Sequence, residues 1–503
     1  DKRLARRRFE EKRHAGKQFA SQRFSLYRFS LQRLSLEGQA VSSAAAAAAV
    51  QSEPAPVVKH AKPKFTNSVV LGAAGAVLLL APLAFGAVEP WSIFALEACA
   101  IALLVTWAAR QWINHQLDIV PNVLYLPMAA FLALAILQWI TGASAYRHVT
   151  YTHILLYAAY GMIAFVVTQS LRRSAQFDWV VKVITGYGAL VAALAVLQGI
   201  APNGKLLWIW SSAQGGWIYG SYVNHNHYAG LMELLAPFPI VLSVSRFSDG
   251  HRRTIIAGIA ALMAGSIFLS GSRGGMLAFC VQMIVLAVLV LRSREGNWKN
   301  ALMLGGVLLL VIGFLVWLGG NDLTHRLVSI HSEVRSEITG GTRMAIDRDG
   351  LRMFVKRPFV GWGLGTFPVV YPQFRSFYTT FFVNEAHNDY LQLLVETGLA
   401  GFLIAAWFLV QLFRHAAAKL KNWTETTSGA LTAAALLGCI GILVHSALDF
   451  NLQIPANAAL FYVFCAIAAA EPMQESNRKR VLRRRHLIIE PVLPTQPATP
   501  PSA

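Results

Sequence analysis

The sequence is short of charge. Only 14% of its 503 residues are Asp, Glu, Lys or Arg, whereas 55% are hydrophobic, and the mean hydropathy is +0.47. Soluble globular domains usually carry about a quarter of their residues as charged side chains. A deficit spread over so long a chain excludes an ordinary cytosolic enzyme, and the high hydrophobic content excludes a wholly disordered protein.

Cysteine is also scarce, which excludes a disulfide-rich secreted protein. The four cysteines are Cys99, Cys280, Cys439 and Cys465. Each lies in an apolar stretch without metal-ligand spacing, so we expect small buried hydrophobic side chains and no metal site. The loops lack an Asp-x-Asp motif for a sugar nucleotide, and the chain lacks a phosphate-binding P-loop. The sequence therefore gives no support to an ATP-driven mechanism.

Much of the positive charge lies at the two ends of the chain. The formal net charge is +19, and the two tails supply 12 of these charges: residues 1–66 hold 14 basic and 5 acidic side chains, and the last 33 residues hold 6 and 3. Basic tails held near anionic headgroups on the cytoplasmic face fit this pattern, and so do solvated tails without a partner. We expect a disordered cytoplasmic tail and linker over 1–66, a second tail over 472–503, and no nucleic-acid partner.

Long apolar runs recur between the tails. Each has roughly 17 to 24 residues, enough for a helix to cross about 30 Å of hydrocarbon. Bare backbone polar groups are not tolerated in lipid, so these runs must be helices. The sequence predicts an all-α polytopic membrane domain over 67–471 with about twelve transmembrane helices. The runs lie near 68–87, 91–109, 122–140, 150–169, 179–200, 227–245, 254–270, 274–292, 300–318, 389–413, 428–446 and 452–470.

The basic residues of the short loops predict the orientation. With the N-terminus inside, the short inner loops hold twelve basic residues and the short outer loops hold three. This asymmetry follows the positive-inside rule and places both termini in the cytoplasm. Residues 319–387 then form a long periplasmic loop between spans 9 and 10, with eight basic residues from Arg326 to Arg375. A long, positively charged outer loop suits a lid over an anionic substrate.

Three outward-facing spots carry candidate chemistry. Arg273 begins a predicted helix within the motif Ser-Gly-Ser-Arg-Gly-Gly. A guanidinium beside the free backbone N–H groups of a helix start suits a phosphate. A tight turn whose Arg side chain reaches the lipid headgroups explains the motif equally well. Arg343 follows Gly-Gly-Thr in the long loop, ahead of further basic residues and a Gly-rich stretch over 358–367. Amphipathic interfacial helices are the simpler interpretation of most of these basic residues.

The third spot is His387, which stands just before a span. A neutral imidazole at a helix N-terminus can accept a proton, although a capping cluster with Asn388 or Asp389 as the cap is the simpler interpretation. Lesser candidates are His225 and His227 at the outer start of another span, and Asp449 after the penultimate span. Within the spans, Glu97 and Glu233 are expected to be paired or functional because an acid in lipid is unfavourable.

The third spot also carries a family resemblance. His387-Asn388, nine residues, Gly398, two residues and Gly401 resemble the His-Asn-x9-Gly-x-x-Gly pattern of the O-antigen ligase (WaaL) and Wzy_C superfamily. The turn around Arg273 is similar to the family's Arg at the outer end of a span, and the loop that contains Arg343 resembles its large periplasmic loop. The resemblance covers residues 68–470 and leaves out the basic N-terminal tail.

The resemblance implies a GT-C-like, inverting, metal-independent glycosyltransferase of the bacterial inner membrane. It also implies that no cofactor is needed, because the diphosphate of the donor already activates the sugar. It implies that Arg273 and Arg343 hold the diphosphate of an undecaprenyl diphosphate-linked glycan, and that His387 is the general base for an acceptor hydroxyl. Asn388, His225, His227 and Asp449 become candidate pocket residues. The leading expectation is an O-antigen ligase that acts on lipid A-core. The alternatives are a Wzy-type polymerase and a protein O-oligosaccharyltransferase, which use the same donor and the same chemistry. Alternatives of another class are a transporter or flippase of lipid-linked sugars and a non-catalytic scaffold.

Overall fold

A computed structural model describes most of the expected membrane body. The expected tails over 1–66 and 472–503, the beginning of the long loop up to residue 340, and nearly all of the expected span at 300–318 lie outside the described residues. In the part that is described, the regular elements are α-helices and short 3-10 helices, which confirms the all-α fold class. The described residues are 67–115, 117–211, 218–245, 247, 250–293, 305, 306, 309, 341–379 and 382–470.

Eleven of the twelve expected spans coincide with helices among these residues. By length and composition, eight helical stretches can cross a membrane, with α7 and α8 counted as one, and three shorter helices are also apolar. The chain is therefore an all-α polytopic membrane protein. The helices are α2 (Asn67–Leu83), α3 (Pro90–Ile113), α4 (Tyr125–Thr141), α5 (Arg147–Ser170), α6 (Ser174–Ile200), α7 (His225–Leu235), α8 (Pro237–Val244), α9 (Gly250–Leu269), α10 (Arg273–Arg292), α14 (Asp389–Lys419), α15 (Thr427–His445) and α16 (Pro455–Ala469).

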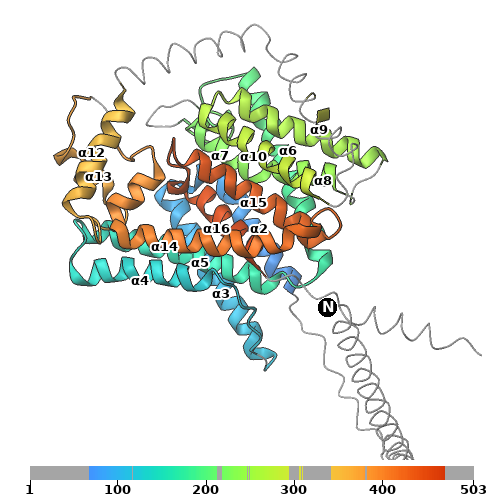
Figure 1. Ribbon diagram of the computed structural model, residues 1–503, viewed down its shortest axis with the longest axis horizontal. Coiled ribbons are helices and arrows are strands. Elements are labelled where there is room, and N and C mark those ends of the chain that lie inside the picture. The colour runs from blue at the N-terminus through green and yellow to red at the C-terminus, as the bar shows by residue number, and fades with distance from the viewer. Residues whose placement is uncertain are drawn as a thin grey trace, which may run out of the picture. The chain divides into compact units, whose positions relative to one another are not determined.

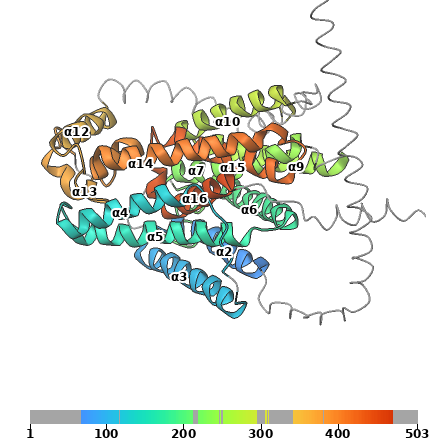
Figure 2. The same cartoon turned by 60° about the horizontal axis from the view of Figure 1, so that its bottom comes forward.

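Helices α15 and α16 lie at the centre of the packing. Figure 1 shows α15 and α16 between the group of α7 to α10 and the group of α4, α5 and α14, and Figure 2 shows the same neighbours from another side. α15 packs on α7, α8 and α10, and α16 packs on α5 and α14. Glycine permits the closest approach: a Cβ at Gly438 of α15 would lie 2.8 Å from the carbonyl oxygen of Leu234 in α7. Small residues at helix contacts are typical of membrane proteins.

The helix ends gather at two opposite ends of the bundle. At one end, Arg172 forms an ion pair with Asp118 at 3.1 Å, and the Lys419 ammonium donates to the carbonyl of Ala470 at 2.6 Å. At the other end lie the starts of α7, α10 and α14 together with the end of α15. The chain thus brings two of the three candidate spots of the sequence, those of Arg273 and His387, to a single end of the bundle.

Helix α14 is broken at Gly398, where φ is 63° and ψ is −165°. The segment 358–363 lies against the break and satisfies the backbone groups that the break frees. The N–H of Leu399 donates to the Pro358 carbonyl at 2.8 Å, and the N–H of Trp362 donates to the Val395 carbonyl at 3.0 Å. The Gly-rich stretch is therefore packed into the helix break, an arrangement that pins the long loop to α14.

The burial predicted for the cysteines is confirmed for only two of them. Cys439 and Cys465 are buried, with their Sγ atoms 3.5 Å apart. Cys99 in α3 and Cys280 in α10 are exposed, so the expectation of burial was wrong for this pair. Both lie on apolar spans, where a side chain that leaves the protein core still meets hydrocarbon, so apolar surroundings in the sequence do not require packing inside the protein.

Gly398→Ala is expected to destabilise the protein by about 3 kcal/mol, because the backbone conformation at Gly398 is nearly restricted to glycine and overpacking adds to the strain. A Cβ there would lie 2.4 Å from the backbone of Phe359. Thermal unfolding of the purified protein measures the effect. Gly186→Ala in α6 is the matched control, since its Cβ meets nothing within 4 Å. Equal unfolding midpoints for Gly398→Ala and the parent would contradict this role of the break.

Candidate active site

The candidate site is built around residues 446–454, which connect α15 to α16 and are called the 446–454 turn below. Asp389, the first residue of α14, is tied to this turn. Its N–H donates to the Ser446 carbonyl at 2.8 Å. Its buried carboxylate accepts from the Ser446 hydroxyl at 2.7 Å, the Leu452 N–H at 3.0 Å and the Gln453 amide at 3.2 Å. These bonds fix the start of α14 on the turn.

His387 lies immediately before this tie. Its φ is 55°, a left-handed conformation that is uncommon away from glycine and is found in particular at functional sites. Its Nδ1 lies 3.3 Å from Oδ1 of Asp449, and its ring contacts Phe450 edge to face, with centroids 4.8 Å apart. The His387 side chain is 32% exposed, whereas that of Asp449 is 1% exposed. One side of the imidazole is thus held by the protein while part of the ring remains accessible.

Asp449 is a buried carboxylate that stays ionised. It also accepts from the Asn226 side chain at 2.5 Å and from the Phe450 N–H at 2.9 Å. Burial alone would raise its pKa, but the hydrogen bond with His387 and the neighbouring His227 hold the pKa of Asp449 well below its usual range. An ionised carboxylate at Nδ1 orients the His387 ring and leaves Nε2 as the proton acceptor.

Arg343 reaches the same turn from α12 (Thr342–Lys356). One of its guanidinium nitrogens donates to the Leu448 carbonyl at 3.2 Å. On the same helix, Asp347 hydrogen-bonds Asn388 and lies near both Arg343 and His387; its partial burial raises its pKa. Asn388 also caps α14 by accepting from the Leu391 N–H at 3.2 Å, so the capping interpretation is confirmed for this residue.

Arg273 begins α10 beside a buried acid–imidazole pair. Nδ1 of His445 lies 2.7 Å from a carboxylate oxygen of Glu233, and both side chains are buried. The expectation of a paired acid is thereby confirmed for Glu233, whereas the Glu97 side chain of α3 makes no hydrogen bond or ion pair with another described residue. The residue after Arg273 packs directly on this pair: a Cβ at Gly274 would lie 2.5 Å from the His445 ring. Because His445 ends α15, the start of α10 lies next to the 446–454 turn.

The two histidines of α7 complete the group. His227 is buried, and its ring contacts Phe450 edge to face at 4.6 Å, so Phe450 touches both His227 and His387. His225 hydrogen-bonds the backbone of Ser270 and lies within electrostatic range of Asp449 and Arg343. The start of α7 therefore bridges the loop before Arg273 and the 446–454 turn.

One of the seven candidate residues of the sequence, Asp449, thus belongs to the 446–454 turn, and the other six lie on segments next to it. Sequence reasoning missed Asn226, Asp347 and Phe450 as partners. Asn226 belongs to the Asn-His-Asn-His motif and Asp347 lies between basic residues, so the sequence contained a weak indication that these two residues are functional. No sequence pattern points to Phe450. Within the described part of the chain, no group of three or more His, Cys, Asp or Glu side chains could hold a metal ion.

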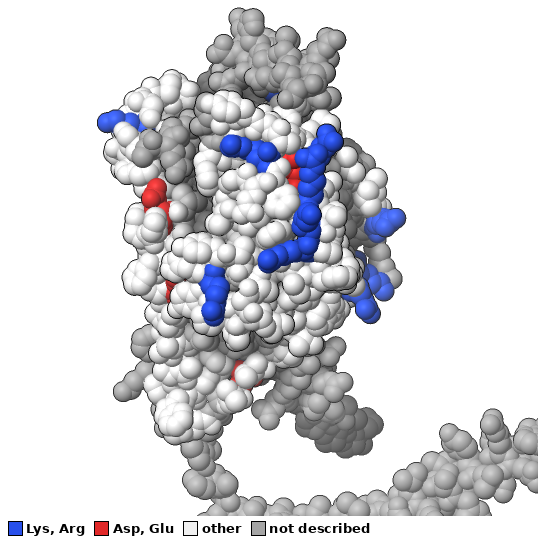
Figure 3. Space-filling view, turned by 90° about the vertical axis from the view of Figure 1, so that its left-hand side faces the viewer, with Lys and Arg blue, Asp and Glu red and all other residues white. Residues whose placement is uncertain are grey.

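Positive charge gathers on the surface next to this site. Figure 3 shows the side of the molecule that carries α12, where Lys and Arg side chains form a line with few acidic neighbours. A field of this sign attracts anionic ligands. The exposed basic residues of α12 and of the chain that follows it up to residue 379 are Arg348, Arg352, Lys356, Arg357 and Arg375.

Comparison with known families bears on the same residues. Residues 258–406 match the Wzy_C family, described as O-antigen ligase. This segment is therefore similar to an O-antigen ligase domain. The matched segment runs from α9 into α14 and so includes Arg273, Arg343 and His387, whereas Asp449 lies beyond it. Members of this family are membrane glycosyltransferase-like enzymes, ligases and polymerases. No curated protein matches the chain.

A second carboxyl group of the site titrates in an unusual range. Burial raises the pKa of Glu385 to about 8, the nearby Glu396 adds to this effect, and a hydrogen bond from the Gln392 amide opposes it. Gln392 also accepts from the Ala386 N–H at 2.9 Å. The protonated form of Glu385 is therefore the form that fits the segment leading to His387.

Glu385→Gln is expected to flatten the pH dependence of the protein's stability. A Glu side chain titrates near pH 4.3 in the unfolded chain and at about 8 in the folded one. The folded state binds the extra proton, so its contribution to stability is full below the unfolded pKa and is lost as the pH rises through about 8. Unfolding midpoints at pH 5 and pH 8.5 test this. The parent should lose more stability than the variant; equal losses would contradict it. Exposed Glu425→Gln serves as control.

Proposed function

We propose that the protein is an inverting glycosyltransferase that moves a glycan from undecaprenyl diphosphate to an acceptor hydroxyl on the periplasmic face of the inner membrane. The observation that carries this proposal is the His387–Asp449 pair, which lies at the end of the bundle where α10 begins with Arg273 and α12 supplies Arg343. The loop charges support cytoplasmic termini, which would turn this end toward the periplasm.

His387 acts as the general base in this proposal. Asp449 holds Nδ1, so Nε2 accepts the proton of the acceptor hydroxyl as its oxygen attacks the anomeric carbon. The bond from that carbon to the diphosphate oxygen breaks on the opposite side, and the configuration is inverted. A base fixed by a buried carboxylate is already oriented before the acceptor arrives, which removes part of the entropic barrier.

Arg273 and Arg343 stabilise the leaving group. Negative charge develops on the diphosphate as the glycosidic bond breaks, and guanidinium groups placed in advance favour that charge in the transition state. The N-terminus of α10 adds the partial positive charge of a helix start beside Arg273. Asp347, which lies near Arg343, would orient this guanidinium.

An O-antigen ligase acting on lipid A-core is the leading assignment. The exposed basic residues beside the site support an anionic acceptor such as a phosphorylated core glycan. A polymerase or a protein O-oligosaccharyltransferase would use the same donor and the same base. A transporter is less favoured, because the buried intramembrane acid Glu233 is engaged by His445, while the candidate residues gather at one end of the bundle.

His387→Ala and Arg273→Ala are each expected to lower glycan transfer by at least about 100-fold, since one removes the base and the other a cation opposite the leaving group. Transfer from a purified undecaprenyl diphosphate-linked glycan in proteoliposomes measures this. His415→Ala and Arg414→Ala, at the opposite end of α14, are the matched controls and should retain activity. Transfer at the parental rate by His387→Ala would rule out its role as the base.

Asp449→Asn is expected to reduce kcat by about 100-fold and to leave KM for the donor nearly unchanged. The amide retains the shape of the side chain but not the charge that orients and stabilises the His387 ring during proton transfer. Steady-state kinetics with varied donor separate the two constants. A rise in KM with an unchanged kcat would show that Asp449 serves donor binding instead.

A further inference from the structure

The first turn of α10 rests on a buried pair of side chains, His445 at the end of α15 and Glu233 of α7. Nδ1 of His445 lies 2.7 Å from Oε1 of Glu233, and the two side chains are 1% and 0% exposed. Two consecutive glycines make room for the pair. A Cβ at Gly274 would lie 2.6 Å from Nε2 of His445, and a Cβ at Gly275 would lie 3.2 Å from Oε1 of Glu233. The glycines after Arg273 thus allow the helix start to approach the pair closely.

His445 also holds the other side of the site, through its backbone. Its carbonyl accepts from the Leu448 N–H at 2.8 Å and from the Asp449 N–H at 3.0 Å. The Leu448 carbonyl in turn accepts from Arg343 at 3.2 Å, and the Asp449 carboxylate lies against the His387 ring. One residue therefore contacts the start of α10 with its side chain and holds, with its main chain, the turn that carries Asp449.

The two members of the pair depend on each other. Among the described residues, Oε2 of Glu233 has no hydrogen-bond partner, so this buried carboxyl group relies on its bond to His445. The same bond fixes the orientation of the imidazole ring. Further along α10, the Gln282 amide donates to the carbonyls of Glu233 at 2.8 Å and Leu437 at 2.9 Å. The body of α10 is thus held separately, and the pair bears on its first turn.

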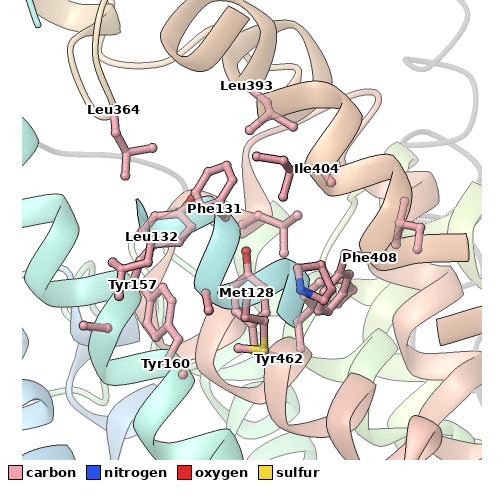
Figure 4. A pocket seen from close by; sticks show the side chains of 18 of the residues that line it. Met128, Phe131, Leu132, Tyr157, Tyr160, Leu364, Leu393, Ile404, Phe408 and Tyr462 are labelled. Carbon is pink, nitrogen blue, oxygen red and sulfur yellow. The ribbon is translucent and has the colours of Figure 1, made fainter. Parts of the chain in front are cut away.

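The large apolar cavity of the bundle does not place this helix start. The cavity has a volume of about 640 Å³, and Figure 4 shows its walls, which are mostly aromatic and aliphatic. The walls come chiefly from α4, α5, α14 and α16, and none of the described residues that line the cavity belongs to α7 or α10. The start of α10 is therefore placed by side chains of α7 and α15 and not by an occupant of the cavity.

We propose that Glu233 and His445 form a positioning pair that sets the place of Arg273 relative to His387 and Asp449. The inference rests on the proposed function for the role of Arg273 as a diphosphate ligand. Both members of the pair are buried, so they act on the substrate only through the first turn of α10. Misplacement of a positioned group by about 1 Å can lower a rate about 100-fold, so a small displacement of this turn is enough to weaken the diphosphate contact.

Three variants disturb this arrangement in different ways. Glu233→Gln keeps the shape of the side chain and removes its charge, which weakens the bond to Nδ1 of His445. The double variant Glu233→Met with His445→Leu replaces the pair by apolar side chains of similar volume, an exchange that is often neutral for the stability of a buried ion pair. Gly274→Ala keeps the pair and displaces the helix start, because the added Cβ would overlap the His445 ring.

Two matched controls change other buried positions. Tyr228→Phe removes a buried hydrogen bond between α7 and Ser266 of α9, at 2.9 Å. Gly258→Ala adds a Cβ to α9, where it meets nothing within 4 Å. Both controls should match the parent in every measurement below.

Two measurements on the full chain in proteoliposomes test the proposal. Hydrogen–deuterium exchange reports on the N–H groups of Gly275 and Met276, which bond Ser272 at 3.1 and 2.9 Å in the first turn of α10. Steady-state kinetics give KM and kcat for the undecaprenyl diphosphate-linked donor. A variant that only loses folded protein lowers the apparent kcat and leaves KM unchanged, so a rise in KM distinguishes positioning from a merely structural role.

Each of the three variants should exchange these two N–H groups at least about tenfold faster than the parent and should raise KM for the donor about tenfold. Parental exchange and parental KM in the folded double variant, or in Gly274→Ala, would overturn the proposal. Faster exchange with an unchanged KM would overturn it as well, since the helix start would then move without consequence for the donor.

The route through Arg273 is tested by a cycle of binding measurements in nanodiscs. Glu233→Gln should weaken the affinity for undecaprenyl diphosphate about tenfold in the parent and should have little further effect in Arg273→Ala, because the pair acts through that guanidinium. Equal factors in the two backgrounds would contradict the proposal, since the pair would then act on the ligand by another route.

Exchange and binding require no transfer, so failure of this inference is distinguishable from failure of the transferase assignment. Faster exchange together with weaker binding of undecaprenyl diphosphate, in a protein that transfers no glycan, would support the pair and refute the proposed reaction. Active transfer with parental KM and parental exchange in the variants would do the reverse.

Discussion

The hydrogen bonds between Asp389 and the 446–454 turn are the constraint on which the rest of the site depends. They join the first residue of α14 to the connection between α15 and α16 through one backbone bond and three bonds to a buried carboxylate. A buried carboxylate is tolerated only when its oxygens are satisfied, so the turn and the helix start form as a unit. With that unit in place, His387 is directed at Asp449, and Phe450 lies between His227 and His387.

A second constraint holds the long loop to the same helix. The break at Gly398 exposes backbone groups that would be intolerable in lipid, and the segment 358–363 satisfies them. Glu396, just before the break, accepts from the N–H groups of Gly365 and Phe367 at 2.8 and 3.1 Å. The loop is therefore anchored near its C-terminal part, and α12 with Arg343 is carried to the 446–454 turn.

The spans could be predicted from the sequence because lipid imposes their length and composition. The run over 389–413 predicted α14 but not its break, since the partner of Gly398 stands about forty residues earlier in a loop and no local pattern links the two. Cys99 and Cys280 show the converse limit: apolar surroundings in the sequence do not distinguish a side chain in the protein core from one that faces hydrocarbon.

The candidate site was predicted unevenly. His387, Arg273 and Arg343 lie in recognisable sequence motifs. Asp449 lies 62 residues from its partner His387, and its position after a predicted span was the only sequence feature that suggested a role. Asp347 and Asn226 could be assigned a role only once folding had brought their helices to the turn. Pairing across the bundle is decided by tertiary packing, which one sequence does not specify.

A double-mutant cycle on the transfer rate tests the central claim, that His387 and Asp449 act as one unit, most directly. The rates of His387→Gln, Asp449→Asn and the double variant are compared with that of the parent. The account predicts that the double variant is about as slow as His387→Gln alone, because Asp449 acts through the imidazole. Losses that multiply in the double variant would show that the two residues act independently and would contradict the account.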